Sequence, residues 1–206
     1  MKLLYVVRHG QTEWNLEGRL QGRLNSDLTA TGRAHADANG QLLSDFGVDK
    51  LLASPLGRTR ATAHIINGYL DLPLDLDERL VERDCGDWSG LTLEQARERN
   101  PRIWDSRDED PFHYRPPGGE NLVDMLSRVA PLLNELSQSQ HERVVLISHG
   151  VMARAILTHF FDLPPAQANA VKQPNNLMYR VSFDAGAPQS GYYRGGPDLF
   201  PGFYTG

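Results

Sequence analysis

The chain has 206 residues, of which 23% are charged and 40% are hydrophobic, and its formal net charge is −5. That length can bury one substantial core, and the composition excludes a disordered or fibrous chain. The negative charge, with no run of five like charges, speaks against nucleic acid or an anionic membrane surface as the partner and favours a small molecule. We therefore expect a single domain over residues 1–206.

The first half of the chain alternates strand and helix patterns. An apolar run rich in strand formers predicts a strand at residues 3–7 that is covered on both faces. A capping threonine and a later glycine favour a helix over residues 30–46. A second strand is expected at residues 49–53. The Ser-Pro pair that follows predicts the start of a helix over residues 54–67, which Gly68 would stop.

The second half continues the alternation. Helical patterns at residues 91–100 and 120–137 are followed by an apolar strand at residues 144–147. That strand leads directly into a helix that must end before Pro164. Alternating apolar and polar residues at 177–183 predict a last strand, which we place at an edge of the sheet.

This order of elements predicts an α/β fold with a mostly parallel sheet and helices on both sides. Two stretches fall outside it: residues 105–119, a charged and Pro-rich substrate loop, and residues 185–206, a C-terminal tail rich in Gly, Pro and Tyr. Cys85 is the sole cysteine, which excludes an intrachain disulfide and fits a cytoplasmic protein. The apolar run before Arg8 is too short for a signal peptide or a membrane span. The oligomeric state is open, with a homodimer as one option.

Cationic and imidazole side chains follow the ends of the three best strands. Ligands of open α/β sheets bind beyond the carboxyl ends of the strands, so these side chains should converge. Arg8 and His9 follow the first strand, Arg58 and Arg60 the second, and His149 the third. A guanidinium donates two parallel hydrogen bonds to phosphate, and a neutral imidazole can attack phosphorus. We choose Arg58 over Arg60, because residues two apart on a helix point to different faces. On spacing alone, either histidine could be the nucleophile.

A departing alkoxide also needs a proton, which a positioned carboxylic acid can supply. Glu82 is the candidate, although it stands among other charged residues and a solvated charge run is the alternative.

Several segments together resemble the signature of the histidine phosphatase superfamily, the phosphoglycerate mutase-like proteins. They occur in the family's order along nearly the whole chain: LYVVRHGQTEWN at 4–15, GRLQG at 18–22, LTATG at 28–32, SPLGRTRATA at 54–63, GDWSGLT at 86–92, PPGGEN at 116–121 and SHG at 148–150. The set is highly specific.

The resemblance implies a three-layer α/β/α sandwich of the phosphoglycerate mutase type, with no metal and no organic cofactor. It implies that His9 becomes phosphorylated and that Glu82 protonates the leaving group and then activates water. The loop at residues 17–22, with Gln21 and Gly22, would form a wall of the pocket. The remaining phosphate-binding residues implied are Arg8, Asn15, Arg58, His149 and Gly150.

The favoured function is hydrolysis of a small phosphorylated metabolite through a phosphohistidine. The alternatives are a cofactor-dependent phosphoglycerate mutase and, from another class, a non-catalytic phospholigand-binding regulator. We expect Cys85 to have a packing role. The aromatic and basic side chains Trp104, Phe112, His113, Tyr114 and Arg115 are candidates for contact with the rest of the substrate, with plain loop packing as the alternative. None of the other histidines has a partner at metal-ligand spacing.

Overall fold

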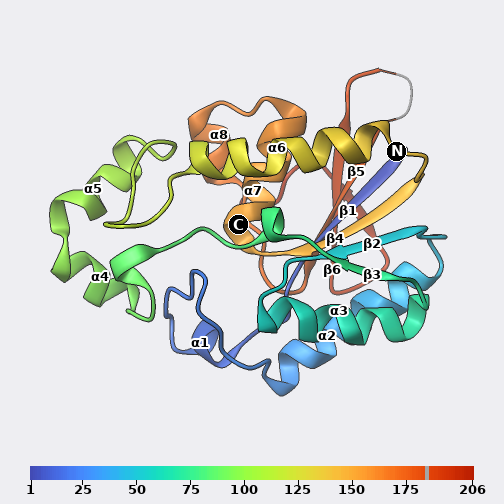
Figure 1. Ribbon diagram of the computed structural model, residues 1–206, viewed down its shortest axis with the longest axis horizontal. Helices are drawn as coiled ribbons and strands as arrows, with labels where there is room; N and C mark the ends of the chain where they lie inside the picture. The colour runs from blue at the N-terminus through green and yellow to red at the C-terminus, as the bar shows by residue number, and fades with distance from the viewer. Residues whose placement is uncertain (184–185) are drawn as a thin grey trace.

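The computed structural model describes residues 1–183 and 186–206, apart from the side chain of Asp108. Its centre is a sheet of strand order β3-β2-β4-β1-β5-β6-β7 (Figure 1). The first four strands in the chain run parallel, and β5, β6 and β7 are antiparallel to their neighbours. The strands span Leu3–Arg8 (β1), Lys50–Ala53 (β2), Leu74–Leu76 (β3), Arg143–Ser148 (β4), Leu177–Ser182 (β5), Gln189–Arg194 (β6) and Leu199–Pro201 (β7).

Helices cover both faces of this sheet. They span Glu13–Leu16 (α1), Ala30–Ser44 (α2), Gly57–Leu70 (α3), Leu93–Arg99 (α4), Pro101–Glu109 (α5), Leu122–Gln138 (α6), Gly150–Phe161 (α7) and Pro165–Ala170 (α8). Short 3-10 turns lie at Glu78–Leu80 and Gly86–Trp88. In Figure 1, α6, α7 and α8 lie above the sheet and α2 and α3 below it.

The alternating side chains of β1 show why three layers form. Leu4 and Val6 pack into the core shared with α6 and α7, whereas Tyr5 and Val7 pack into the core shared with α2 and α3. All four are buried, because successive side chains of a strand point to opposite faces and both faces are covered. The predicted α/β sandwich with a parallel centre is confirmed.

The last predicted strand forms, but its predicted position at an edge is wrong. β5 lies between β1 and β6 and pairs antiparallel with both. The edge position falls instead to β7, which lies inside the expected tail. That tail therefore contributes β6 and β7 to the sheet, although its first residue, Ala185, lies outside the described residues. The alternation of apolar and polar residues in β5 did not reveal that a further hairpin covers its outer side.

The boundaries of α3 also differ from the prediction. The helix begins at Gly57 with Leu56 as N-cap, so Ser54 does not cap it. It continues through Gly68 to Leu70 and ends at Asp71, which has a left-handed backbone with φ 50°. The Asn67 side chain accepts from the backbone N–H of Leu72 and donates to its carbonyl, which fixes the turn. A single glycine inside a helix costs only about 1 kcal/mol, so it need not end one.

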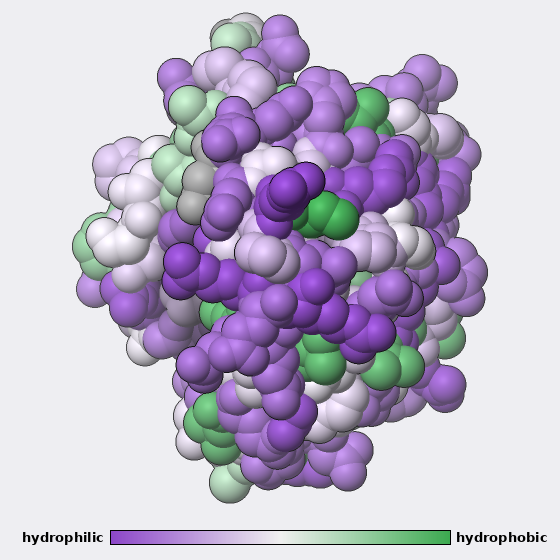
Figure 2. All heavy atoms as spheres, turned by 90° about the vertical axis from the view of Figure 1, so that its left-hand side faces the viewer, coloured by the Kyte–Doolittle hydropathy of each residue, from purple (hydrophilic) through white to green (hydrophobic). Residues whose placement is uncertain are grey.

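Helices α4 and α5 stand to one side of the sheet over a small separate core of Cys85, Trp88 and Ala96 (Figure 1). Part of the predicted loop 105–119 is thus the end of α5. Figure 2 turns this side toward the viewer and shows a mainly hydrophilic surface with scattered apolar side chains. Within residues 1–183 and 186–206, no helix combines the length and apolar character needed to cross a bilayer.

Candidate active site

The ends of β1 and β4 and the start of α3 meet at a cavity of about 480 Å³. Of the residues predicted for the site, eight line it: Arg8, His9, Asn15, Gln21, Gly22, Arg58, Glu82 and Gly150. His149 is fully buried just behind, with its ring centroid 5.3 Å from that of His9. We call the set Arg8, His9, Arg58, Glu82 and His149 the inner end of the cavity.

His9 is 2% exposed and is fixed through both ring nitrogens. Arg58 Nε, which can only donate, lies 3.2 Å from His9 Nε2, so Nε2 carries the lone pair. Nδ1 therefore carries the hydrogen and donates it to the Gly10 carbonyl at 2.8 Å. Burial, and then the positive charges of Arg8 and Arg58, hold the pKa of His9 well below its ordinary value of 6.5. The imidazole is consequently neutral at neutral pH, with a nucleophilic nitrogen beside a cation.

A close backbone contact holds the turn after His9. A Cβ atom added to Gly10 would lie 2.1 Å from the carbonyl oxygen of Gly32 at the start of α2. Only glycine permits this approach of two backbones. The Gly10 N–H donates to Thr62 Oγ1 of α3 at 3.0 Å. The glycines of the RHG and LTATG segments are thus explained by packing.

Arg58 is 1% exposed, and protein groups occupy three of its five N–H donors. Besides Nε, one Nη donates to the Leu24 carbonyl at 2.6 Å and the other to the Gly22 carbonyl at 2.8 Å. Two N–H groups remain for a ligand. Burial lowers the pKa of Arg58 to about 10, with Glu82 opposing that shift and Arg8 adding to it. The guanidinium is still ionised at neutral pH.

Arg8 approaches the same cavity from the end of β1. One Nη donates to the Gln173 carbonyl at 2.6 Å, and Nε is buried with no hydrogen-bond partner among the described residues. A Cβ atom on Gly150 would lie 3.4 Å from the Arg8 guanidinium carbon, so the glycine leaves room for this side chain. Burial lowers the pKa of Arg8, and the charge of Glu82 opposes that shift.

His149 is the N-cap residue of α7, and its side chain is aimed by Ser54. Its Nε2 lies 2.9 Å from Ser54 Oγ, while Nδ1 is buried without a partner in the described part of the chain. Burial, followed by the positive charge of Arg58, holds the pKa of His149 well below 6.5. The sequence prediction treated Ser54 only as a helix cap, and its contact with His149 was missed.

Glu82 lies at the other side of the inner end and is held by backbone groups. Its Oε1 accepts from the N–H groups of Arg83 at 2.8 Å and Met152 at 3.2 Å, and its Oε2 accepts from Val151 at 3.2 Å. Two of these donors belong to the first turn of α7, where N–H groups have no partner within the helix. The carboxyl is therefore fixed at the cavity, where its charge acts on Arg8, and does not belong to a solvated charge run.

The predicted residues of the loop before α2 have different surroundings. Asn15 lines the cavity and its Oδ1 accepts from the Thr12 N–H at 3.1 Å. Gln21 also lines the cavity, and its side chain donates to Thr12 Oγ1 at 2.8 Å and accepts from Ser26 Oγ. Gly22 has a left-handed backbone with φ 51° and supplies the carbonyl that holds Arg58.

Most of the cavity's other lining residues were not predicted. Five basic or aromatic lining residues outside the inner end form what we call the outer wall: Arg19, Arg83, Arg154, Lys172 and Tyr204. Of these, Arg19 alone belongs to the wall predicted at residues 17–22. Tyr204 reaches the cavity because the chain after β7 turns back, where its carbonyl accepts from the Lys172 N–H at 2.9 Å. The four basic residues of the outer wall come from four separate segments, so no local sequence pattern predicts that they meet.

The predicted contacts of the loop 105–119 differ from the observed lining. Trp104, Phe112, His113, Tyr114 and Arg115 are absent from the lining. The ring of Trp104 packs on Trp88, the His113 ring contacts the Asp110 carboxylate, and Arg115 makes an ion pair with Asp124. Tyr114 does not line the cavity itself but contacts a lining residue, because Arg83 donates to its hydroxyl. Loop packing is the better interpretation of this segment.

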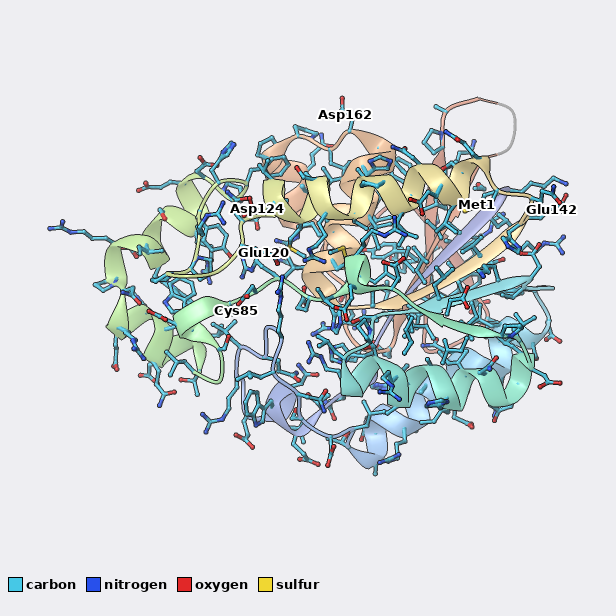
Figure 3. All side chains as sticks on the ribbon, in the orientation of Figure 1. Met1, Cys85, Glu120, Asp124, Glu142 and Asp162 are labelled. Carbon is cyan, nitrogen blue, oxygen red and sulfur yellow. The ribbon has the colours of Figure 1, made fainter. Side chains whose placement is uncertain are left out.

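Two predictions concerned Cys85 and metal ligands. The thiol of Cys85 belongs to the small core under α4, touches the cavity and has a pKa raised by burial. Cys85 and Glu120 lie on the α4 side of the sheet in Figure 3. Within the described residues, no group of three or more His, Cys, Asp or Glu side chains is placed to hold a metal ion.

Comparisons with known proteins agree with this geometry. The chain is 35% identical over 184 residues to an uncharacterized phosphatase, PhoE, of Bacillus subtilis (strain 168), covering 89% of each protein. It is 32% identical to a probable phosphoglycerate mutase, GpmB, of Salmonella paratyphi B, covering 89% of this chain and 86% of the relative. A mycobacterial glucosyl-3-phosphoglycerate phosphatase in complex with VO3 superposes with a TM-score of 0.82 at 32% identity, over 88% of this chain and 93% of that one. The profile of the histidine phosphatase superfamily (branch 1) matches residues 4–193, and the chain belongs to that family.

Proposed function

We propose that the protein is a phosphatase that hydrolyses a small phosphate monoester through a phosphohistidine on His9. The observation that carries this proposal is the state of His9: a neutral imidazole whose Nε2 lone pair lies 3.2 Å from the Nε of a buried guanidinium. A nucleophile and a cation for the transferred phosphoryl group are thereby adjacent. Phosphatases among the relatives support the same reaction class.

In the first step, His9 Nε2 attacks phosphorus in line with the departing oxygen. A P–N bond forms as the P–O bond to the alcohol breaks, and Glu82 gives its proton to the alkoxide. Arg8, the two free N–H groups of Arg58 and the Nδ1 side of His149 receive the equatorial oxygens. The buried cations need no reorganisation as charge spreads over these oxygens, which is the main source of rate in phosphoryl transfer.

In the second step, a water molecule takes the place of the alcohol. The Glu82 carboxylate accepts a proton from it, the new P–O bond forms, and the P–N bond breaks to regenerate neutral His9 and release phosphate. The same carboxyl thus alternates between acid and base. We also propose a metal-independent reaction, a single functional domain and a cytoplasmic location.

A mutase remains the second candidate, because GpmB is among the relatives. It would share the first step and differ in returning the phosphoryl group to a retained acceptor. Such an enzyme needs a bisphosphorylated primer to charge His9, so hydrolysis of a monoester without primer separates the two. A non-catalytic regulator would bind phosphate and transfer none.

The test is His9→Ala assayed with 4-nitrophenyl phosphate and chelator, beside His64→Ala, which removes an exposed imidazole of α3. We expect the first variant to lose about 10⁴-fold or more in kcat and the second to keep its activity, as for removal of other catalytic nucleophiles. Acid-labile phosphate should be trapped on the unaltered protein and on His64→Ala, but not on His9→Ala. Activity retained in His9→Ala would overturn the proposal.

A further inference from the structure

The peptide group between His9 and Gly10 lies just past the end of β1, which pairs with its neighbouring strands only as far as Arg8. Two side chains from distant segments bind this peptide group. Asn175, in the segment before β5, donates from Nδ2 to the His9 carbonyl at 2.8 Å. Thr62, on α3, accepts from the Gly10 N–H at 3.0 Å through Oγ1. Both polar ends of the peptide group after the nucleophile are therefore held by side chains.

The chemistry of the partners fixes the direction of both hydrogen bonds. A carbonyl only accepts, so Asn175 must present its amide nitrogen, and a second acceptor, Asn15 Oδ1, lies 3.4 Å from the same nitrogen. The Gly10 N–H only donates, and the Thr62 hydroxyl gives its own hydrogen to the Arg58 carbonyl at 2.8 Å. Each side chain thus has one orientation in which it can hold the peptide group.

This support matters because a glycine follows the nucleophile. Gly10 has no side chain to restrict its backbone, and the close approach of Gly32 excludes any larger residue. The Gly10 carbonyl nevertheless stays 2.8 Å from His9 Nδ1, where it accepts the hydrogen and leaves the lone pair on Nε2. A preceding peptide group that is held at both ends restricts the rotation that would carry this carbonyl away.

Thr62 also connects the nucleophile to its neighbouring cation. Its hydroxyl binds both the Gly10 N–H and the carbonyl of Arg58, one turn earlier in α3. Thr62 is fully buried, so water cannot take the place of this hydroxyl. One oxygen atom therefore links the backbones on which the 3.2 Å distance between His9 Nε2 and Arg58 Nε depends.

We propose that Asn175 and Thr62 are positioning residues, which hold the peptide group after His9 so that Nε2 stays directed at the phosphoryl group. This inference rests on the proposed phosphatase function and adds two residues to it. Neither side chain belongs to the described lining of the cavity, so both act through His9 and not on the substrate. Their loss should slow phosphoryl transfer and leave the binding of the anion intact.

The experiment compares Asn175→Ala and Thr62→Val with the unaltered protein. The measured quantities are kcat/KM for 4-nitrophenyl phosphate and the competitive inhibition constant of inorganic phosphate. Loss of one such hydrogen bond corresponds to roughly a two- to tenfold change, so we expect kcat/KM to fall by that factor in each variant. The inhibition constant should not change, because Arg8 and Arg58 remain to bind phosphate. A pocket that is merely loosened would lose both to the same extent.

Three further variants are matched controls. Thr62→Ser keeps the hydroxyl and should restore most of kcat/KM. Thr158→Val removes a buried hydroxyl of α7 that has no hydrogen-bond partner among the described residues. Asn176 binds Gly195 through its backbone carbonyl, so Asn176→Ala removes an amide from the same segment without breaking that bond. The last two variants should keep kcat/KM, and thermal unfolding checks that every variant folds.

The double variant Asn175→Ala/Thr62→Val tests whether the two residues act on one peptide group. If the first substitution already frees the peptide group, the second adds little. The double variant should therefore lose clearly less than the product of the two single losses. Losses that multiply would overturn the shared role, as would an inhibition constant that rises in step with the fall in kcat/KM.

A spectroscopic measurement separates this inference from the proposed function. The ¹H–¹⁵N signal of His9 Nδ1–H reports the bond to the Gly10 carbonyl without any turnover. We expect its ¹H shift to decrease and its exchange with water to become faster in Asn175→Ala and in Thr62→Val, but not in Asn176→Ala. These changes in a protein that hydrolyses no phosphate ester would refute the phosphatase and keep the positioning role. An unchanged signal in both variants refutes the positioning role, and hydrolysis by the unaltered protein would then leave the phosphatase intact.

Discussion

The inner end and the outer wall of the cavity are both basic, yet they are built in different ways. At the inner end, His9, Arg58 and His149 stand at the ends of strands or the starts of helices. His9 and Arg58 are bonded to each other and to backbone groups, and His149 is bonded to the Ser54 hydroxyl. The outer wall takes Arg83, Arg154 and other cations from four segments far apart in the chain, with few bonds among them. The inner end is fixed in place by protein groups, whereas the basic side chains of the outer wall face the cavity.

Glu82→Gln tests the inner end, and we expect from it the largest loss of activity among the four variants that follow. The amide keeps the size of the side chain but cannot give or take the proton. For an alkyl phosphate we expect kcat/KM to fall by about 10² to 10⁴, and for 4-nitrophenyl phosphate, whose leaving group needs no proton, by much less. An equal loss for both substrates would exclude Glu82 as the acid. Glu78→Gln, in the nearby 3-10 turn, is the matched control.

Arg58→Lys should come next in size. Lysine keeps the charge but cannot make the three separate bonds to His9 and to the Leu24 and Gly22 carbonyls. Loss of one oriented donor typically costs about 10² to 10³ in kcat, and we expect this range in steady-state assays. Arg60→Lys, two residues along the same helix, should leave kcat unchanged. If both variants behave alike, the orientation of Arg58 has no role.

Much of the inner end could be predicted, because its parts are local. The apolar run before Arg8 and the short SHG segment each depend on a few neighbouring residues, whereas the contact between Gly10 and Gly32 appeared only in the structure. Parallel strands bring such segments together at one edge of the sheet without further information. The family resemblance added Glu82, for which spacing alone could not exclude a surface charge.

The remainder depended on contacts that no local pattern encodes. β5 was placed at an edge because its own sequence does not indicate that β6 pairs with it. The chain after β7 was treated as a tail, although Tyr204 returns to the cavity. Arg83 and Arg154 were ordinary charged residues until the fold placed both at one wall. Ser54 was assigned to a helix start and instead contacts His149.

Ser54→Ala examines that positioning contact, with a smaller expected effect. The Leu56 N–H approaches Ser54 Oγ at 3.4 Å, so the hydroxyl can donate to His149 Nε2 and keep the hydrogen on Nδ1. Losing one such bond costs about 0.5 to 1.5 kcal/mol, which corresponds to roughly a two- to tenfold loss in kcat. In Ser54→Ala, the ¹⁵N chemical shifts of the His149 ring should show a different distribution between the two tautomers. A purely structural role of Ser54 would not change that distribution. Ser54→Thr keeps the hydroxyl and should retain the wild-type shifts.

The smallest effect on activity is expected from Arg23→Gln. Arg23 follows Gly22 in the chain and connects this loop to Asp84 and Glu120. Arg23 pairs with Glu120 at 3.3 Å and with Asp84 at 3.6 Å, and its side chain is half exposed. Exposed pairs contribute about 0 to 1 kcal/mol and are screened by salt, so we expect KM to rise by at most about fivefold at low ionic strength. The difference should vanish in 0.5 M salt, and Arg33→Gln, on the exposed face of α2, should show none at either salt concentration. If the rise in KM persists in high salt, or if kcat also falls, the contact of Arg23 must help to hold the Gly22 carbonyl against Arg58. Arg23 would then belong to the inner end and not to its surroundings.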